Sequence, residues 1–99
     1  MELKSQKSAT VLTVSLFGEL NTLTAPELSL LLDRELPGFQ TLTLDFAGCD
    51  YVSSAGIRVL LATFKLLKAS KGKMYLTNVG ENFMEVLENT GLDAVFDIA

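Results

Sequence analysis

The chain has 99 residues, 48% of them hydrophobic, and its eight basic and twelve acidic side chains give a formal net charge of −4. This length predicts one folded domain over residues 1–99, and the acidic balance argues against nucleic acid, which is bound through clustered cations. Histidine is absent, which excludes a serine or cysteine hydrolase with an imidazole base and the usual zinc ligand sets.

The N-terminal residues predict two strands. Residues 1–6 are expected to form an edge strand, and residues 12–17 alternate between apolar and polar side chains, as in a strand with one buried face. The short polar segment 7–10 would turn the chain into a hairpin between them, and Gly18 would end the second strand.

A first helix is expected to begin at residues 24–27, Thr-Ala-Pro-Glu, which have the spacing of a capping box with proline in the first turn. Its apolar stripe consists of leucines: Leu28, Leu31, Leu32 and Leu36. Pro37 and Gly38 would end this helix. Residues 41–46 alternate again and predict the central strand, which leads into a loop with two serines.

The chain after this loop predicts a second, more apolar helix that ends at residues 70–72. A strand around residues 74–76 and a third helix over residues 81–90 follow, with Gly91 as the C-terminal cap of that helix. Residues 92–98 form a last apolar segment, which the pattern leaves open as either a short helix or a strand.

The order of these elements predicts an α/β fold, because crossovers through helices make parallel neighbours while the opening hairpin adds an antiparallel edge. We expect a mixed β-sheet of four to five strands with an antiparallel N-terminal hairpin. Three to four helices would lie mostly on one face of the sheet.

The strand–loop–helix segment of residues 50–61 says most about function. Ser54 is predicted to cap the helix, and Gly56 lies in its first turn, where glycine costs about 1 kcal/mol relative to alanine. Since helix stability does not favour that glycine, we interpret it as leaving the backbone bare for a close contact. An exposed hydroxyl at the positive end of a helix suits contact with a partner or attachment of a phosphate.

The other candidate groups predict no chemistry of their own. Asp45 and Asp50 flank the loop and leave open an enzyme that acts through acidic residues, although their spacing matches no metal-binding loop and solvated charge is the simpler interpretation. The glycines form neither a phosphate-binding loop nor a dinucleotide fingerprint. We therefore expect no catalysis, no metal and no cofactor.

Cys49 is the only cysteine, so no internal disulfide can form, and we expect it to be buried as a small hydrophobic residue in a reducing compartment. The N-terminus has no uninterrupted apolar core of a signal peptide, and the longest apolar stretch, residues 59–67, is shorter than the roughly 20 residues that span a bilayer. The sequence predicts a cytoplasmic protein without direct membrane insertion.

Four segments together closely resemble the STAS domain of bacterial anti-sigma factor antagonists. They are Gly18-Glu19-Leu20-Asn21, Thr24-Ala25-Pro26, residues 51–57, and Thr90-Gly91-Leu92 followed by residues 95–98. In that family, the serine two residues before the loop glycine is phosphorylated by an anti-sigma factor that is also a kinase. The resemblance therefore implies phosphorylation of Ser54.

The resemblance also implies a function. Unphosphorylated antagonists bind the anti-sigma factor serine kinase and so free a sigma factor, phosphorylation ends that binding, and a PP2C-type phosphatase restores it. The implied partner-binding residues are Asn21, Ser53, Ser54, Ala55, Gly56, Ile57 and Arg58. The alternative is a STAS subunit that regulates or assembles an ABC-type lipid transporter through its ATPase.

This chain departs from many members of that family at two positions. Ser53 stands where many relatives have aspartate immediately before the phosphorylated serine, and Asn21 stands where they have aspartate after Gly-Glu-Leu. Both replacements remove a negative charge near the site. If those carboxylates help to orient the hydroxyl, recognition by the kinase would differ in this chain.

Overall fold

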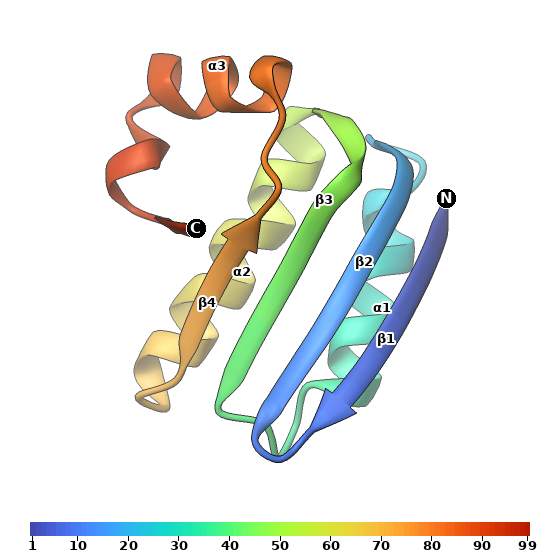
Figure 1. Cartoon of the computed structure of the whole chain (residues 1–99), viewed down its shortest axis with the longest axis vertical. Helices are drawn as coiled ribbons and strands as arrows, with labels where there is room; N and C mark the ends of the chain where they lie inside the picture. Colours follow the sequence, from blue (N-terminus) through green and yellow to red (C-terminus); the bar gives the residue numbers. More distant parts are fainter.

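A five-stranded mixed sheet forms the centre of the computed structural model, which describes residues 1–99. The strands lie side by side in chain order: β1 (Glu2–Ser8), β2 (Val11–Leu20), β3 (Thr41–Val52), β4 (Lys73–Thr77) and β5 (Asp97–Ile98). Strands β1 and β2 pair antiparallel, and every later pair is parallel (Figure 1). The predicted mixed sheet and its N-terminal hairpin are confirmed.

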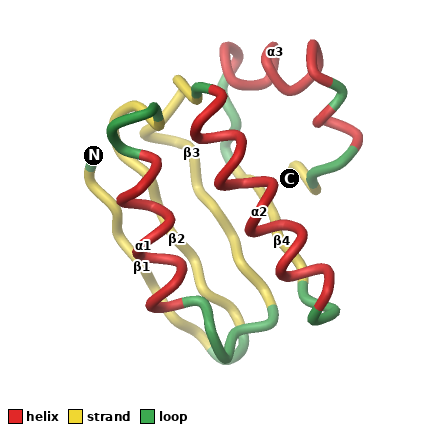
Figure 2. The backbone as a smooth tube through the Cα atoms, turned by 180° about the vertical axis from the view of Figure 1, so that it is seen from behind, coloured by secondary structure: helices red, strands yellow, loops and turns green.

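Two helices, α1 (Ala25–Glu35) and α2 (Ser54–Ala69), run side by side over one face of the sheet (Figure 2). The third, α3 (Glu81–Thr90), crosses the end of the sheet where β3 and β4 finish (Figure 1). The last segment contains both of the structures left open by the sequence, a single 3₁₀ turn η1 (Leu92–Ala94) and the short strand β5. The expectation that the helices lie mostly on one face is confirmed.

The core lies between the sheet and helices α1 and α2. Alternate residues of β2 and β3 point into it, and the leucine stripe of α1 packs on them, as the two periodicities predicted. Its buried members from these three elements include Leu12, Val14, Leu16, Leu28, Leu32, Leu42, Leu44 and Phe46. A layer of helices thus covers one face of the sheet, and the ends of β2 and β3 stay free to carry loops.

Strand β2 does not end at Gly18, contrary to the sequence prediction. Gly18 has a φ of +114°, and the pairing of β2 with β3 shifts register on both sides of Phe17 before it resumes. Glycine adopts this backbone conformation without a steric cost, so the strand bends through an irregularity and continues. The resumed pairs, Glu19 with Tyr51 and Leu20 with Val52, extend both strands to the serine loop.

The capping box predicted at the start of α1 is wrong, although the helix does begin at Ala25. Thr24 makes no side-chain cap bond to the helix; its hydroxyl instead donates a 2.6 Å hydrogen bond to the carbonyl of Glu19. The carboxylate of Glu27 lies 3.9 Å from the N-terminal ammonium group. The threonine therefore closes the loop between β2 and α1 instead of capping the helix.

Candidate functional site

The serine loop joins β3 to α2 at the end of the sheet that α3 crosses (Figure 1). Ser53, not Ser54, occupies the N-cap position, and the first helical hydrogen bond runs from the amide of Ile57 to the carbonyl of Ser53 at 2.9 Å. Ser54 is the first helical residue and is exposed. The prediction that Ser54 caps the helix is wrong by one position. Because Ser53 is the cap residue, the Ser54 hydroxyl has no capping role.

Ser53 fixes the loop through its backbone. Its amide donates a 2.8 Å hydrogen bond to the carbonyl of Leu20, which ties the start of α2 to the end of β2. Its side chain makes no capping bond, and Ser53 Oγ is buried without a hydrogen-bond partner. A buried hydroxyl without a partner is uncommon in folded proteins and costs free energy.

Gly56 is buried, so the bare backbone expected at this position does not lie on the surface. A Cβ atom there would lie 2.8 Å from Leu20 Cγ and 2.9 Å from Val52 Cγ1. Real Cβ atoms do not approach other carbon atoms this closely. The glycine is explained by close packing of the first turn of α2 on the ends of β2 and β3.

Asn21 directs its side chain into its own loop. Its Oδ1 atom accepts hydrogen bonds from the amides of Leu23 at 3.0 Å and Thr24 at 3.1 Å, a pattern typical of asparagine and aspartate in turns. Asn21 is partly buried and lies directly after Leu20, the residue bonded to Ser53. The structure therefore brings Asn21 and the serines into adjoining loops.

The remaining predicted site residues lie along the first turns of α2. Ala55 and Ile57 are partly buried and pack against the core, whereas Arg58 is exposed. Arg58 also lines a cavity of about 720 Å³ between α1 and α2. The exposed surface of the predicted site is thus carried chiefly by Ser54 and Arg58.

Sequence reasoning missed the structural role of Asp50. Its carboxylate accepts a 3.2 Å hydrogen bond from the amide of Phe83 and a 2.8 Å bond from the side chain of Asn82. A Cβ atom on Gly80, the N-cap residue of α3, would overlap this carboxylate. Asp50 therefore caps α3 from another element, a contact between residues more than 30 positions apart that no local pattern signals.

The acidic-enzyme alternative receives no support from these contacts. Asp45 accepts hydrogen bonds from the amide of Ala47 at 3.0 Å and the side chain of Asn78 at 2.9 Å, and Asp50 is bound to α3. Both carboxylates thus hold backbone or amide groups of the fold. Asp50 is therefore not the purely solvated charge that the sequence favoured.

Two exposed apolar residues in the segments next to the serine loop were also missed. Leu23, in the loop that Asn21 closes, is 84% exposed, and Tyr51, two residues before Ser53, is 54% exposed. A large apolar residue within a polar loop was the available signal for Leu23. Exposed apolar side chains beside a polar centre are typical of protein–protein contact surfaces.

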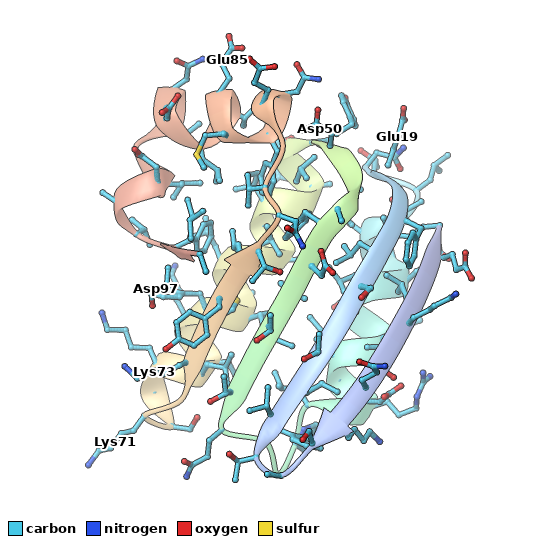
Figure 3. All side chains as sticks on the ribbon, viewed as in Figure 1. Glu19, Asp50, Lys71, Lys73, Glu85 and Asp97 are labelled. Carbon is cyan, nitrogen blue, oxygen red and sulfur yellow. The ribbon has the colours of Figure 1, made fainter.

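Charge is distributed unevenly over the molecule. Figure 3 shows Glu19, Asp50 and Glu85 at the end where α2 begins, and Lys71 and Lys73 at the opposite end. The serine loop therefore lies at the end of the molecule that carries these three carboxylates.

Cys49 is buried, as predicted, with 1% of its surface exposed. Desolvation by this burial raises the pKa of the Cys49 thiol above its ordinary value, which disfavours the reactive thiolate. No helix in the chain combines the length and the apolar character needed to cross a bilayer.

Comparisons with known proteins agree on one family. A family model described as the STAS domain matches residues 2–99. BtrV of Bordetella bronchiseptica, which carries the name of an anti-sigma factor antagonist, is 32% identical over 100 residues. The alignment covers 100% of this chain and 86% of the relative. The anti-sigma-B factor antagonist of Bacillus subtilis is 29% identical over 86 residues, covering 87% of this chain and 79% of that protein.

Solved structures show the same fold. The crystal structure of an anti-sigma factor antagonist from Mycobacterium paratuberculosis aligns with a TM-score of 0.86 at 24% identity. The alignment covers 98% of this chain and 83% of that one.

Proposed function

Since this chain belongs to the STAS domain family, we propose that it acts as an anti-sigma factor antagonist whose binding is switched by phosphorylation of Ser54. In the unphosphorylated state it binds an anti-sigma factor serine kinase and so releases a sigma factor. The chain itself catalyses no reaction, and a PP2C-type phosphatase restores the unphosphorylated state. The names of the two curated relatives support the antagonist role.

The exposed hydroxyl of Ser54, held at the start of a packed helix, is the observation that carries this proposal. The kinase would transfer the γ-phosphoryl group of ATP to Ser54 Oγ, with loss of the hydroxyl proton and release of ADP. The surrounding backbone is anchored by the bond from Ser53 to Leu20 and by the packing at Gly56. The modification would therefore change the surface without disturbing the core.

Electrostatics explain how such a modification separates two proteins. A phosphoserine adds about −1.5 to −2 charges at neutral pH, and desolvating them inside an interface is costly. The first turn of α2 contains no acidic residue, so the fold itself tolerates a phosphate beside its helix N-terminus. The same charge would enlarge the negative potential of an end that already carries Glu19 and Asp50.

The partner surface that we propose combines the predicted residues with the two apolar side chains that the sequence reasoning missed. Ser54 and Arg58 lie at its centre, with Asn21, Ser53, Ala55 and Ile57 behind them, and Leu23 and Tyr51 supply exposed apolar area. Gly56 contributes through packing, because its position allows the helix to approach the sheet.

The test combines the purified chain, its cognate kinase and ATP, with intact mass and binding affinity as readouts. We expect one phosphate on the wild type and on Ser53→Ala, and none on Ser54→Ala. Ser54→Asp should bind the kinase at least about tenfold more weakly than wild type, equivalent to 1.4 kcal/mol.

The proposal fails if no phosphate is found on Ser54 and Ser54→Asp binds as tightly as wild type. Copurification with a transporter ATPase and with no kinase would instead favour the ABC-transporter subunit. Affinity purification from the native organism, followed by identification of the bound proteins, separates these two outcomes.

A further inference from the structure

Ser54 and Arg58 are four residues apart on α2, and both are exposed. Side chains at this spacing lie on the same face of a helix, with Cβ atoms about 5–6 Å apart. An anion followed four residues later by a cation is the favourable order for a helical ion pair. A phosphate on Ser54 would therefore lie within reach of the Arg58 guanidinium.

Arg58 has no ionic partner in the unphosphorylated chain. The four ion pairs of the structure involve the N-terminus, Lys4, Lys7 and Arg34. Arg58 is also the only basic residue between positions 54 and 64, since the next one along α2 is Lys65. Its guanidinium is thus available either to a partner protein or to a new anion on the same helix.

The charges at this end of the molecule give the Arg58 guanidinium a role in binding a phosphate. The end of the molecule that carries the serine loop is lined by Glu19, Asp50 and Glu85 (Figure 3). A phosphate on Ser54 would add charge to this end, and Arg58 is the basic residue closest to it along the helix. Guanidinium groups bind phosphate through two parallel hydrogen bonds, which a lysine cannot reproduce.

We propose that Arg58 binds the phosphate of phosphorylated Ser54 within α2 and is thereby withdrawn from the partner surface. The inference rests on the proposed function, because it assigns a regulatory role to the same site. Phosphorylation then acts in two ways: it adds negative charge where the partner binds, and it occupies the cation that contributes to the unphosphorylated surface.

The first test needs no kinase. Phosphoserine is incorporated at position 54 of the full chain during translation, and the second pKa of the phosphate is measured by ³¹P NMR. A nearby cation stabilises the dianion and lowers this pKa, so Arg58→Gln should raise it by about 0.3–1 unit. Arg58→Lys should raise it by less.

Lys65→Gln is the matched control. It removes one positive charge from nearly the same face of α2, about 10 Å further along the helix, and should change the phosphate pKa by less than about 0.1 unit. Equal phosphate pKa values in wild type and Arg58→Gln would overturn the inference. This result would leave the proposed function intact, because it is independent of kinase recognition.

The second test addresses the partner surface. Binding to the kinase is measured for wild type and Arg58→Gln, each with serine and with phosphoserine at position 54. If phosphorylation withdraws Arg58, it should reduce affinity by a smaller factor in Arg58→Gln than in wild type. Equal factors in the two backgrounds would show that Arg58 takes no part in the switch.

Discussion

In the first turn of α2, Gly56 has no side chain, and this allows the helix to approach the sheet closely. Leu20 is fully buried, and its Cγ atom would lie 2.8 Å from a Cβ at position 56. Ser54 precedes this contact by two residues, so the position of its hydroxyl depends on a packing contact and not on a hydrogen bond of its own. Gly56 thus allows the turn that carries Ser54 to pack closely on the sheet.

Gly56→Ala is predicted to destabilise the chain, although alanine is the better helix former by about 1 kcal/mol. Overpacking against Leu20 and Val52 should lower the free energy of unfolding by about 1–3 kcal/mol, measured by urea denaturation. In a Leu20→Ala background the same substitution should cost less, because the opposing side chain is removed. A more stable Gly56→Ala single variant would contradict this account.

At the level of elements, α3 is attached to the body of the protein by two contacts from β3. The carboxylate of Asp50 caps its first turn, and the rings of Phe46 and Phe83 pack with centroids 4.9 Å apart. Asp50 also lies three residues before Ser53, so one short segment carries both the serine loop and the support of α3.

Asp50→Ala is predicted to loosen α3 while the rest of the sheet stays protected. Loss of a helix cap costs about 0.5–2 kcal/mol, which corresponds to roughly 2-fold to 30-fold faster amide exchange through local opening. Hydrogen–deuterium exchange should show this change in residues 84–90 and not in β1 or β2. Asp45→Ala, which removes a carboxylate with no contact to α3, is the control. Equal protection of α3 in both variants would refute the capping role.

Across the whole molecule, the carboxylate of Glu35 connects the edge strand β1 to helix α1. Ser5 Oγ on β1 donates a 2.7 Å hydrogen bond to Glu35 Oε1 on α1, and Lys7 Nζ lies 3.8 Å from the same oxygen. The hydrogen bond from Ser5 is the main cause that lowers the pKa of Glu35 below its ordinary value of 4.5, and Arg34 and Lys7 act in the same direction. The ionised form is therefore favoured by folding.

This shift predicts a pH dependence of stability. Because the pKa of Glu35 is lowered in the folded state, its contribution is fully present above the ordinary value of 4.5 and is lost as the pH falls through the folded-state pKa. The difference in thermal unfolding midpoint between wild type and Glu35→Gln should be constant near neutral pH and should shrink under acidic conditions. Ser5→Ala should show the same trend, and a difference independent of pH in both variants would exclude this linkage.

Hydrophobic periodicity and the positions of turn and cap residues were enough to predict most of the architecture. Alternation in residues 12–17 and 41–46, the leucine stripe of α1 and the cap at Gly91 each depend on neighbours in sequence, and each was confirmed. Two local predictions failed for a shared reason. The capping box at Thr24 and the strand end at Gly18 were overruled by hydrogen bonds and strand pairing that involve other parts of the chain.

In the candidate site, too, features set by neighbours in sequence were predicted, and features set by distant contacts were not. The sequence by itself determined that a serine pair would lie between the central strand and a long helix, because hydrophobic patterns place those elements. Only the tertiary structure decided that Ser53 would be the cap and Ser54 the exposed residue, that Gly56 would face the core, and that Asp50 would support α3. Burial follows from the local order of apolar and polar residues, whereas these contacts form only where strand ends and helix ends meet in space.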